Sequence, residues 1–382
     1  MSDMQTRESL EPLIAVADAS VQALQDAIDA RGPRAVTAAL VEELLARCPA
    51  PQIDREVLVR LDVTHDGELI SSTLRLAAGQ PVTAQDGAHP DAVMTIDYEL
   101  TELVREMYGR TGDRTPVRGL RLATADQDHY PPRELQRPIS EAMTIVLGAL
   151  SARPPDLGAL AVRFGSDKWG NVHWFTQHYE RHFARLRDEP VRLLELGIGG
   201  YEHPDQGGGS LRMWRSYFRR GQVYGLDLFS KTDLDGIRLR TLRGDQNDPD
   251  CLARIAAEFG PFDIIIDDGS HINEHVLTSF RALFPHVRPG GFYVIEDLWT
   301  SYLPGYGGDG QDLDNPSTML VMIKSLVDAL HHEERAPRPG PPTAAEQHLA
   351  GLHVYHNIAF LEKGRNAEGR IPAWIPRAPY WL

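Results

Sequence analysis

The sequence predicts two domains of different fold class, a smaller α+β domain followed by a larger α/β domain with a doubly wound sheet. The chain has 382 residues, a length typical of about two domains. Apolar and polar residues alternate in the first part, whereas unbroken apolar runs alternate with helical stretches in the second. A polar segment rich in proline and arginine, residues 112–138, separates these patterns. We therefore expect an auxiliary domain with its linker at residues 1–138 and an α/β domain at residues 139–382.

The first domain is expected to begin with two amphipathic helices, which Gly32-Pro33 separates. A hairpin follows, because two alternating stretches flank Asp66-Gly67, a pair that favours a tight turn. One more strand and helix complete the α+β pattern. The expected elements are helices at 13–28 and 35–48, strands at 57–63, 69–76 and 92–98, and a helix at 99–108.

The second domain is expected to contain a parallel sheet. After a helix at 141–152, apolar β-type stretches alternate with helical ones. Runs such as Ile264-Ile265-Ile266 lack alternation, as expected of strands that are buried on both faces. The expected strands are 191–196, 222–229, 237–244, 262–267 and 291–295.

Charge and cysteine content exclude several classes of protein. The 54 acidic and 39 basic residues give a formal net charge of −15, which opposes binding to nucleic acid or to an anionic membrane. Cys48 and Cys251 alone cannot form a disulfide framework or a four-thiolate zinc site. No stretch approaches the ~20 apolar residues that span a bilayer, and the first apolar run is too short for a signal peptide. We expect no nucleic acid, no membrane anchor and a cytoplasmic location.

A glycine-containing loop follows the first strand of the predicted parallel sheet. Glu195 ends the strand, and Gly197 and Gly199 let a ligand approach the backbone at the carboxyl edge. A dinucleotide fingerprint would need a third glycine where Glu202 stands, and this carboxylate would repel a pyrophosphate. S-adenosylmethionine, a cation without a pyrophosphate, suits the loop better. The structural alternative is a tight strand-to-helix turn.

Polar side chains also end the next two strands. Asp227 ends the second strand, where it can accept hydrogen bonds from both ribose hydroxyls of the cofactor. Asp245 and Gln246 end the third strand, where the same edge geometry would bring them to the adenine. The alternative for each aspartate is a helix cap.

Four carboxylates and one imidazole follow the fourth and fifth strands. Asp267, Asp268 and His271 follow the fourth strand, and Glu296 and Asp297 follow the fifth. Because close carboxylates repel one another and no basic residue lies near them in sequence, we expect a divalent cation among them. Carboxylate ligands indicate Mg²⁺ or Mn²⁺ rather than zinc. His271 is suited to accept a proton near neutral pH, and helix caps with a structural histidine are the alternative.

Further ordered motifs accompany these residues. They are FGSDKWG at 164–170, HYE at 178–180, LELGIGGY at 194–201, GGGSLRMW at 207–214, GDQ at 244–246, DDGSH at 267–271, VIEDL at 294–298 and HNIAF at 356–360. With these motifs, residues 155 to about 370 resemble the metal-dependent macrolide-sugar O-methyltransferases of the mycinamicin and tylosin pathways. In that family a class I methyltransferase domain follows an N-terminal auxiliary domain.

The resemblance implies a role for each candidate residue. The residues implied to contact S-adenosylmethionine lie in these motifs or next to them. They are Glu195, Gly197, Gly199, Tyr201, Ser210, Asp227, Asp245, Gln246 and Asp267. The implied Mg²⁺ ligands are Asp268, Glu296 and Asp297, with His271 as general base. Family members form tetramers, so the resemblance also implies a homotetramer.

We therefore predict an O-methyltransferase that methylates a deoxysugar hydroxyl, the 2-hydroxyl, of a glycosylated polyketide in antibiotic biosynthesis. Related enzymes methylate rhamnose on anthracycline-like aglycones, and the sequence does not separate these from a macrolide. A non-haem iron hydroxylase is an alternative, although its usual site has two histidines and one carboxylate. From another class, a lipid- or polyketide-binding protein would not need the intact set of Asp268, His271, Glu296 and Asp297.

Overall fold

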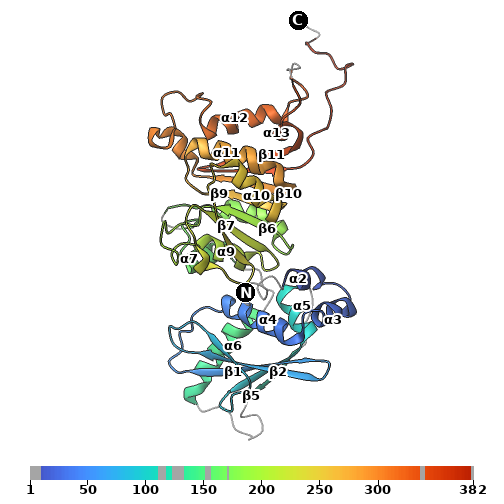
Figure 1. The fold of residues 1–382 in the computed structure, drawn as a ribbon, viewed down its shortest axis with the longest axis vertical. Coiled ribbons are helices and arrows are strands. Elements are labelled where there is room, and N and C mark those ends of the chain that lie inside the picture. The colour runs from blue at the N-terminus through green and yellow to red at the C-terminus, as the bar shows by residue number, and fades with distance from the viewer. Residues whose placement is uncertain are drawn as a thin grey trace.

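The computed structural model describes residues 10–110, 118–122, 133–150, 156–169, 172–335 and 340–379. The chain forms two domains stacked along the long axis of the molecule (Figure 1). The first domain contains a five-stranded sheet and the second a seven-stranded sheet. The predicted combination of an α+β domain with a doubly wound α/β domain is confirmed.

In the first domain, helices and a mixed sheet share one apolar core. The strand order is β3-β2-β1-β4-β5, and the predicted hairpin is formed by β1 and β2. The elements are α2 (Glu11–Val16), α3 (Val21–Asp29), α4 (Pro33–Arg47), β1 (Val57–His65), β2 (Glu68–Leu76), β3 (Thr83–Asp86), β4 (Met94–Glu99), α5 (Leu100–Tyr108), β5 (Gly119–Leu122) and α6 (Arg133–Leu150).

Two helices of this domain differ from the prediction. The single helix expected at 13–28 is divided into α2 and α3, because the Ser20 hydroxyl accepts a hydrogen bond from the Ala23 amide at 3.2 Å and caps a new helix. Helix α6 begins inside the segment predicted as a linker and contains Pro138. Apart from β5 and the start of α6, that linker lies mostly outside the described residues.

The domain boundary predicted at residue 138 falls within α6. Ala142, Val146 and Leu150 of this helix are fully buried in the core of the first domain. We therefore propose that the first domain extends through Leu150.

In the second domain, the sheet has the order β11-β12-β10-β9-β6-β7-β8. Strands β8, β7, β6, β9 and β10 are parallel, and β12 is antiparallel to both of its neighbours. The elements are α7 (Leu157–Phe164), α8 (Thr176–Phe183), β6 (Arg192–Leu196), α9 (Gly209–Tyr217), β7 (Gln222–Asp227), β8 (Leu239–Arg243), α10 (Pro249–Phe259), β9 (Phe262–Asp267), α11 (Asn273–Leu283), β10 (Val287–Glu296), α12 (Met319–Leu330), α13 (Ala344–His348), β11 (Leu349–Tyr355) and β12 (Ile358–Lys363). Short 3₁₀ turns are η2 (Ala184–Leu186), η3 (Thr232–Leu234), η4 (Phe284–His286), η5 (Leu298–Tyr302) and η6 (Pro304–Tyr306).

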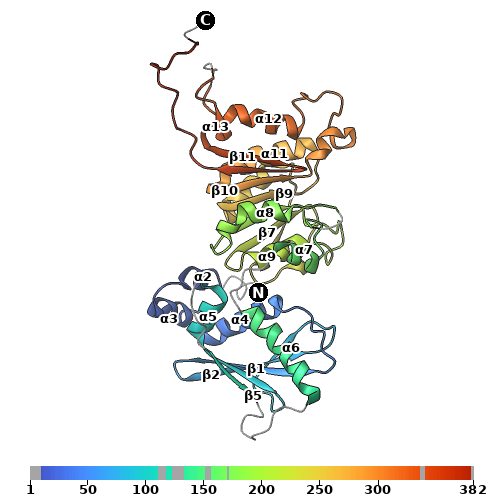
Figure 2. The same ribbon diagram turned by 180° about the vertical axis from the view of Figure 1, so that it is seen from behind.

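Helices cover both faces of this sheet. Buried residues of α7, α8 and α9 form one apolar cluster, and those of α10, α11 and α12 form another. Seen from behind, α8 lies across the face opposite α10 (Figure 2). The chain runs outward from β6 to β8 and then returns to β9, so the strand order reverses between β6 and β9. Open α/β sheets bind ligands outside the carboxyl ends of the strands at such a point.

The helices and the two cysteines bear on the expected absence of a membrane anchor and of a disulfide framework. Within the described part of the chain, no helix has both the length and the apolar character needed to cross a bilayer. Cys48 and Cys251 are both buried and free, as expected for a chain without a disulfide framework. Burial raises the pKa of the Cys48 thiol to about 12, so this thiol has little thiolate character at neutral pH.

A buried ion pair joins the two domains. Glu43 of α4 and Arg238 of the second domain each have 1% exposed side chains, and Arg238 Nε lies 3.2 Å from Glu43 Oε2. Arg47 Nε also contacts Glu43, at 2.8 Å from Oε1. Although burial opposes ionisation, the charges of Arg238 and Arg47 lower the pKa of Glu43 to about 2.

We expect Glu43→Gln to lower the free energy of unfolding by about 3–5 kcal/mol, because it leaves a buried guanidinium without its counter-charge. Urea denaturation at pH 7 measures this, and exposed Glu42→Gln is the matched control. An ordinary glutamate has a pKa of about 4.3. The stabilisation that ionised Glu43 gives the native protein is therefore complete above that pH, and it is lost as the pH falls toward 2. Equal stability of the two variants would contradict this role.

Candidate active site

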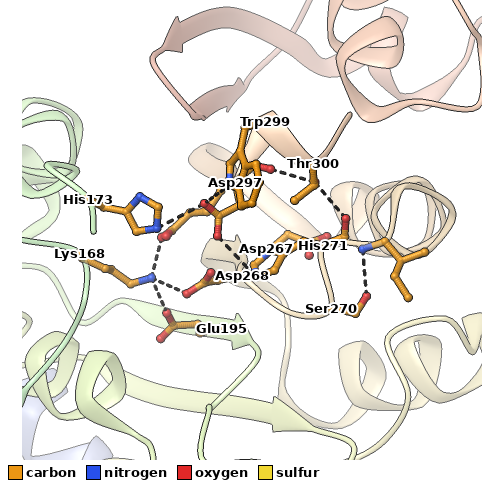
Figure 3. A network of polar contacts seen from close by, with 12 residues as sticks. Lys168, His173, Glu195, Asp267, Asp268, Ser270, His271, Asp297, Trp299 and Thr300 are labelled. Atoms are coloured by element: carbon orange, nitrogen blue, oxygen red, sulfur yellow. Dashed lines mark hydrogen bonds and ion pairs between the residues drawn. The ribbon is translucent and has the colours of Figure 1, made fainter. Parts of the chain in front are cut away.

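The loops that follow β6, β9 and β10 converge at the carboxyl edge of the sheet. Asp268, His271 and Asp297 of these loops lie near Glu195 at the end of β6, so residues from three separate segments of the sequence meet here (Figure 3). Gly197 makes this convergence possible, because its φ is 91° and an added Cβ would lie 2.1 Å from the carbonyl oxygen of Asp268. The grouping predicted from strand ends is therefore present.

Lys168 lies at the centre of the carboxylates. The sequence does not predict this position. Its side chain is completely buried, and Nζ lies 2.7 Å from Asp268 Oδ2, 2.7 Å from Glu296 Oε1 and 3.1 Å from Glu195 Oε1. The Tyr179 hydroxyl also donates to Glu296 Oε1. No basic residue lies near these carboxylates in sequence, but the fold brings in Lys168 from a loop 100 residues before Asp268.

Burial and crowding set the electrostatics of this cluster. Burial and the charge of Asp268 raise the pKa of Glu296 well above its usual range. Burial raises the pKa of Glu195 to about 7. Burial alone would lower the pKa of Lys168, but the negative charges of Asp268 and Glu296 hold it well above the ordinary value. The Lys168 ammonium therefore remains charged, whereas Glu296 and Glu195 resist ionisation.

Asp297 lies between two imidazoles. His271 Nε2 is 3.5 Å from Asp297 Oδ2, and His173 Nε2 is 3.3 Å from Asp297 Oδ1. The Trp299 indole also donates to Asp297 Oδ1, at 3.1 Å. Both His271 and Asp297 have left-handed backbones, with φ values of 56° and 55°. Non-glycine residues in this conformation often occur at functional sites.

Three of these residues form a donor set for a metal ion. Asp268, His271 and Asp297 each offer one ligand atom, and these atoms lie within 4.8 Å of one another. The two carboxylates supply the oxygen ligands that Mg²⁺ prefers. Glu296, the third predicted ligand, is 2% exposed and is held by Lys168 and Tyr179. Its coordination of the ion therefore stays a prediction.

The predicted cofactor residues occupy the adjacent part of the same edge. The Ser210 hydroxyl donates to Glu195 Oε2 at 2.9 Å, which joins the start of α9 to the end of β6. Asp227 accepts from the amide of Ile198 at 3.0 Å and from that of Phe229 at 2.9 Å. Each of its oxygens retains a free lone pair for a further donor.

Other predicted cofactor residues differ in exposure. Gly199 is exposed and has a φ of 77°, with the Cα of Gly207 3.9 Å from where a Cβ would lie, and Tyr201 is 79% exposed. Asp245 is exposed and accepts from the amide of Asn247 at 2.8 Å. These three residues are accessible to a ligand.

Asp267 and Gln246 instead link two loops. Asp267 is 1% exposed and accepts from the Tyr293 hydroxyl at 3.0 Å, from Gln246 Nε2 at 3.1 Å and from the Ser279 hydroxyl. Gln246 Oε1 in turn accepts from the amide of Ser270 at 2.7 Å. Burial raises the pKa of Asp267 to about 6 despite these donors. Asp267 thus has a structural role in the site, and its contact with a cofactor stays a prediction.

Several known proteins are similar to this chain. A family model described as MycE methyltransferase N-terminal matches residues 10–117. Demethylmacrocin O-methyltransferase of Streptomyces fradiae is 51% identical over 363 residues, which are 93% of this chain and 91% of that enzyme. Mycinamicin VI 2″-O-methyltransferase of Micromonospora griseorubida is 49% identical over 351 residues, 90% of this chain and 88% of that enzyme.

A solved structure is similar to this chain over nearly its whole length. The MycE methyltransferase of the mycinamicin biosynthetic pathway, in complex with Mg, SAH and mycinamicin VI, matches with a TM-score of 0.89 and 45% identity. The match covers 97% of each chain. With its auxiliary domain, its seven-stranded sheet and these relatives, the chain belongs to the family of macrolide and polyketide sugar O-methyltransferases.

Proposed function

We propose that this protein methylates the 2-hydroxyl of a deoxysugar on a glycosylated polyketide of the macrolide class, with S-adenosylmethionine as methyl donor and Mg²⁺ as metal ion. The observation that carries the proposal is the convergence of Asp268, His271 and Asp297 beside the glycine loop after β6. Relatives that act on macrolide sugars support the substrate class, and the mycinamicin relative supports the 2-hydroxyl. Family membership favours methyl transfer over the hydroxylase and binding-protein alternatives.

In this proposal, Asp268 and Asp297 hold Mg²⁺, and Glu296 joins them as the third carboxylate. When bound, the ion makes a neighbouring sugar hydroxyl easier to deprotonate. Lys168 holds Asp268 and Glu296 in place and limits the repulsion between them. Gly197 keeps the glycine loop against the backbone of Asp268, so the donor site and the metal site lie next to each other.

The proton of the sugar hydroxyl is taken by His271 Nε2. This side chain is 25% exposed, and the carboxylate of Asp297 at 3.5 Å stabilises the imidazolium that results. Glu195, Asp227 and the glycine loop bind the methyl donor, and Asp227 accepts hydrogen bonds from its ribose. Because both reactants are held at one edge of a rigid sheet, orientation supplies much of the rate.

The proposal is tested by incubating the protein with S-adenosylmethionine, Mg²⁺ and a panel of demethylated macrolide glycosides. We expect mass spectrometry to show the addition of one methyl group, and NMR to place it on the 2-oxygen. An excess of EDTA should abolish turnover and added Mg²⁺ should restore it. Full activity in EDTA would refute the metal's role, and a product methylated at another hydroxyl would refute the regiochemistry.

We expect Asp227→Ala to weaken S-adenosylhomocysteine binding by about 1.5–3 kcal/mol, roughly 10- to 150-fold in Kd, because a charged acceptor to ribose is lost. Isothermal titration calorimetry measures the change. Asp227→Asn keeps one acceptor and should lose less affinity, and Asp233→Ala, at an exposed neighbour, should lose none. An unchanged Kd in Asp227→Ala would leave this residue only its contacts with Ile198 and Phe229.

We also propose a homotetramer in the cytoplasm. The resemblance in sequence supports the assembly, and the two buried free thiols suit a reducing compartment. Light scattering coupled to size-exclusion chromatography should give the mass of four chains, and a monomer mass would contradict the assembly.

A further inference from the structure

A cavity of about 290 Å³ lies between the two domains, and none of its lining residues belongs to the carboxylate cluster. Its walls come from α4 and α6 of the first domain and from α7 and α9 of the second. Three guanidinium groups, those of Arg47, Arg163 and Arg219, line it. We propose that this cavity binds a small organic anion, whose carboxylate or phosphate group is held by these arginines.

The arginines are placed as a built site rather than as mobile surface residues. Arg47 and Arg219 are almost fully buried, with about 8% of the Arg47 side chain and of Arg219 exposed. Arg47 is fixed by Glu43 and by the Met107 carbonyl oxygen at 3.2 Å. Arg163 lies at the more exposed side of the cavity and donates to the Cys48 carbonyl oxygen at 2.8 Å. The positions of Arg47 and Arg163 are therefore set by the protein itself.

Positive charge exceeds negative charge around the cavity. Glu43 and Asp188 are the acids that act on Arg219, and Glu43 is already shared between Arg47 and Arg238. Burial and the charge of Arg47 lower the pKa of Arg219 to about 9, and burial lowers the pKa of Arg215 nearby. Buried cations of one sign repel one another, and an anion between them would relieve this repulsion.

The lining also limits the kind of anion. Ile145, Ala149 and Leu160 also line the cavity and add apolar surface beside the charges. A guanidinium fork matches the two oxygens of a carboxylate or phosphate. The chain as a whole carries a net charge of −15, so affinity for an anion would be a local property of this cavity. A ligand with one oxyanion group and a short apolar body fits both features.

The test uses the full-length protein with benzoate and inorganic phosphate as probes, at an ionic strength held constant with NaCl. We expect saturating probe to raise Tm by roughly 3–5 °C, because a ligand of the native state stabilises it. Calorimetry should show one site per chain. Tighter binding of benzoate would indicate a carboxylate ligand, and tighter binding of phosphate a phosphorylated one.

Variants locate the site. Arg163→Gln and Arg219→Gln should each weaken binding by roughly tenfold or more, since a charged hydrogen-bond donor is lost. Arg185→Gln removes an arginine that contacts Glu362 and the Gly290 carbonyl instead, and it should bind the probes as the native protein does. Unchanged S-adenosylhomocysteine affinity confirms that each variant is folded. Because Arg163 is exposed, we expect Arg163→Gln to fold even if Arg219→Gln does not, so the proposal can still be tested. No Tm shift beyond that of NaCl, or full binding in both variants, would overturn the proposal.

Discussion

Replacing His271 with alanine is expected to lower kcat by roughly 10²–10⁴, the usual contribution of a positioned general base. The imidazole is partly exposed at the carboxyl edge, and the Asp297 carboxylate lies 3.5 Å from its Nε2. Its left-handed backbone directs it into the cluster, and its carbonyl oxygen accepts from the Thr300 hydroxyl at 3.0 Å. The affinity for S-adenosylhomocysteine should remain unchanged, since the glycine loop and Asp227 are untouched.

The same variant separates a base from a metal ligand. His271 belongs to the donor set with Asp268 and Asp297, so geometry alone permits coordination. Mg²⁺ prefers oxygen ligands, which favours the role of a base. If His271 is a base, excess Mg²⁺ will not restore the rate, and the Kd for Mn²⁺ measured by electron paramagnetic resonance will be unchanged. Restoration by excess metal would make it a ligand.

His173→Ala is the matched control, because His173 contacts the other oxygen of Asp297 and stacks on Phe175. We expect a smaller loss of kcat there, since this imidazole is only 11% exposed. A near-native kcat in His271→Ala together with a large loss in His173→Ala would transfer the role of base to His173.

The strands of the second domain could be predicted because burial on both faces leaves a direct mark on the sequence. Runs such as 264–266 have no polar position, and such strands must lie in the middle of a covered sheet. The sequence pattern does not predict strands β11 and β12, although the HNIAF motif at 356–360 covers the start of β12. Both strands follow a proline-rich stretch, and β11 lies at the edge of the sheet, where exposure weakens the apolar pattern. Strand β12 is buried between β11 and β10, and it pairs antiparallel with both. Because proline is unfavourable inside a helix, Pro138 favoured a linker where α6 has already begun at Arg133.

The candidate site was predictable where residues share an edge and unpredictable where they meet from distant loops. Asp227, Asp268 and Asp297 each end or directly follow a parallel strand, and the carboxyl ends of such strands lie side by side. Lys168 has no such constraint, because it follows α7 in a loop and approaches the carboxylates through the tertiary fold. The sequence feature that points to Lys168 is its place inside the FGSDKWG motif at 164–170.

Lys168→Met is expected to have the second large effect, because methionine keeps much of the length of the side chain and removes its charge. Asp268, Glu296 and Glu195 would then lose the ammonium that lies within 2.7–3.1 Å of each. Breaking the ion pair with Asp268 costs up to about 3–5 kcal/mol of folding free energy, whereas Glu296 and Glu195, whose pKa values are raised, remain protonated more easily. Asp268 and Glu296 would also lose the group that positions them, so turnover should fall at every Mg²⁺ concentration below saturation.

The dependence on Mg²⁺ distinguishes this role from simple packing. Without the ammonium, a divalent cation is the remaining positive charge that can offset the carboxylates, so Mg²⁺ should raise the Tm of Lys168→Met more than that of the native protein. Lys363→Met is the control, because Lys363 is also buried but donates to the carbonyl oxygens of Phe284 at 3.2 Å and Pro285 at 2.6 Å. That variant should lose stability without a change in its response to Mg²⁺. If both variants respond to Mg²⁺ alike, Lys168 fills space in the core and does not position the carboxylates.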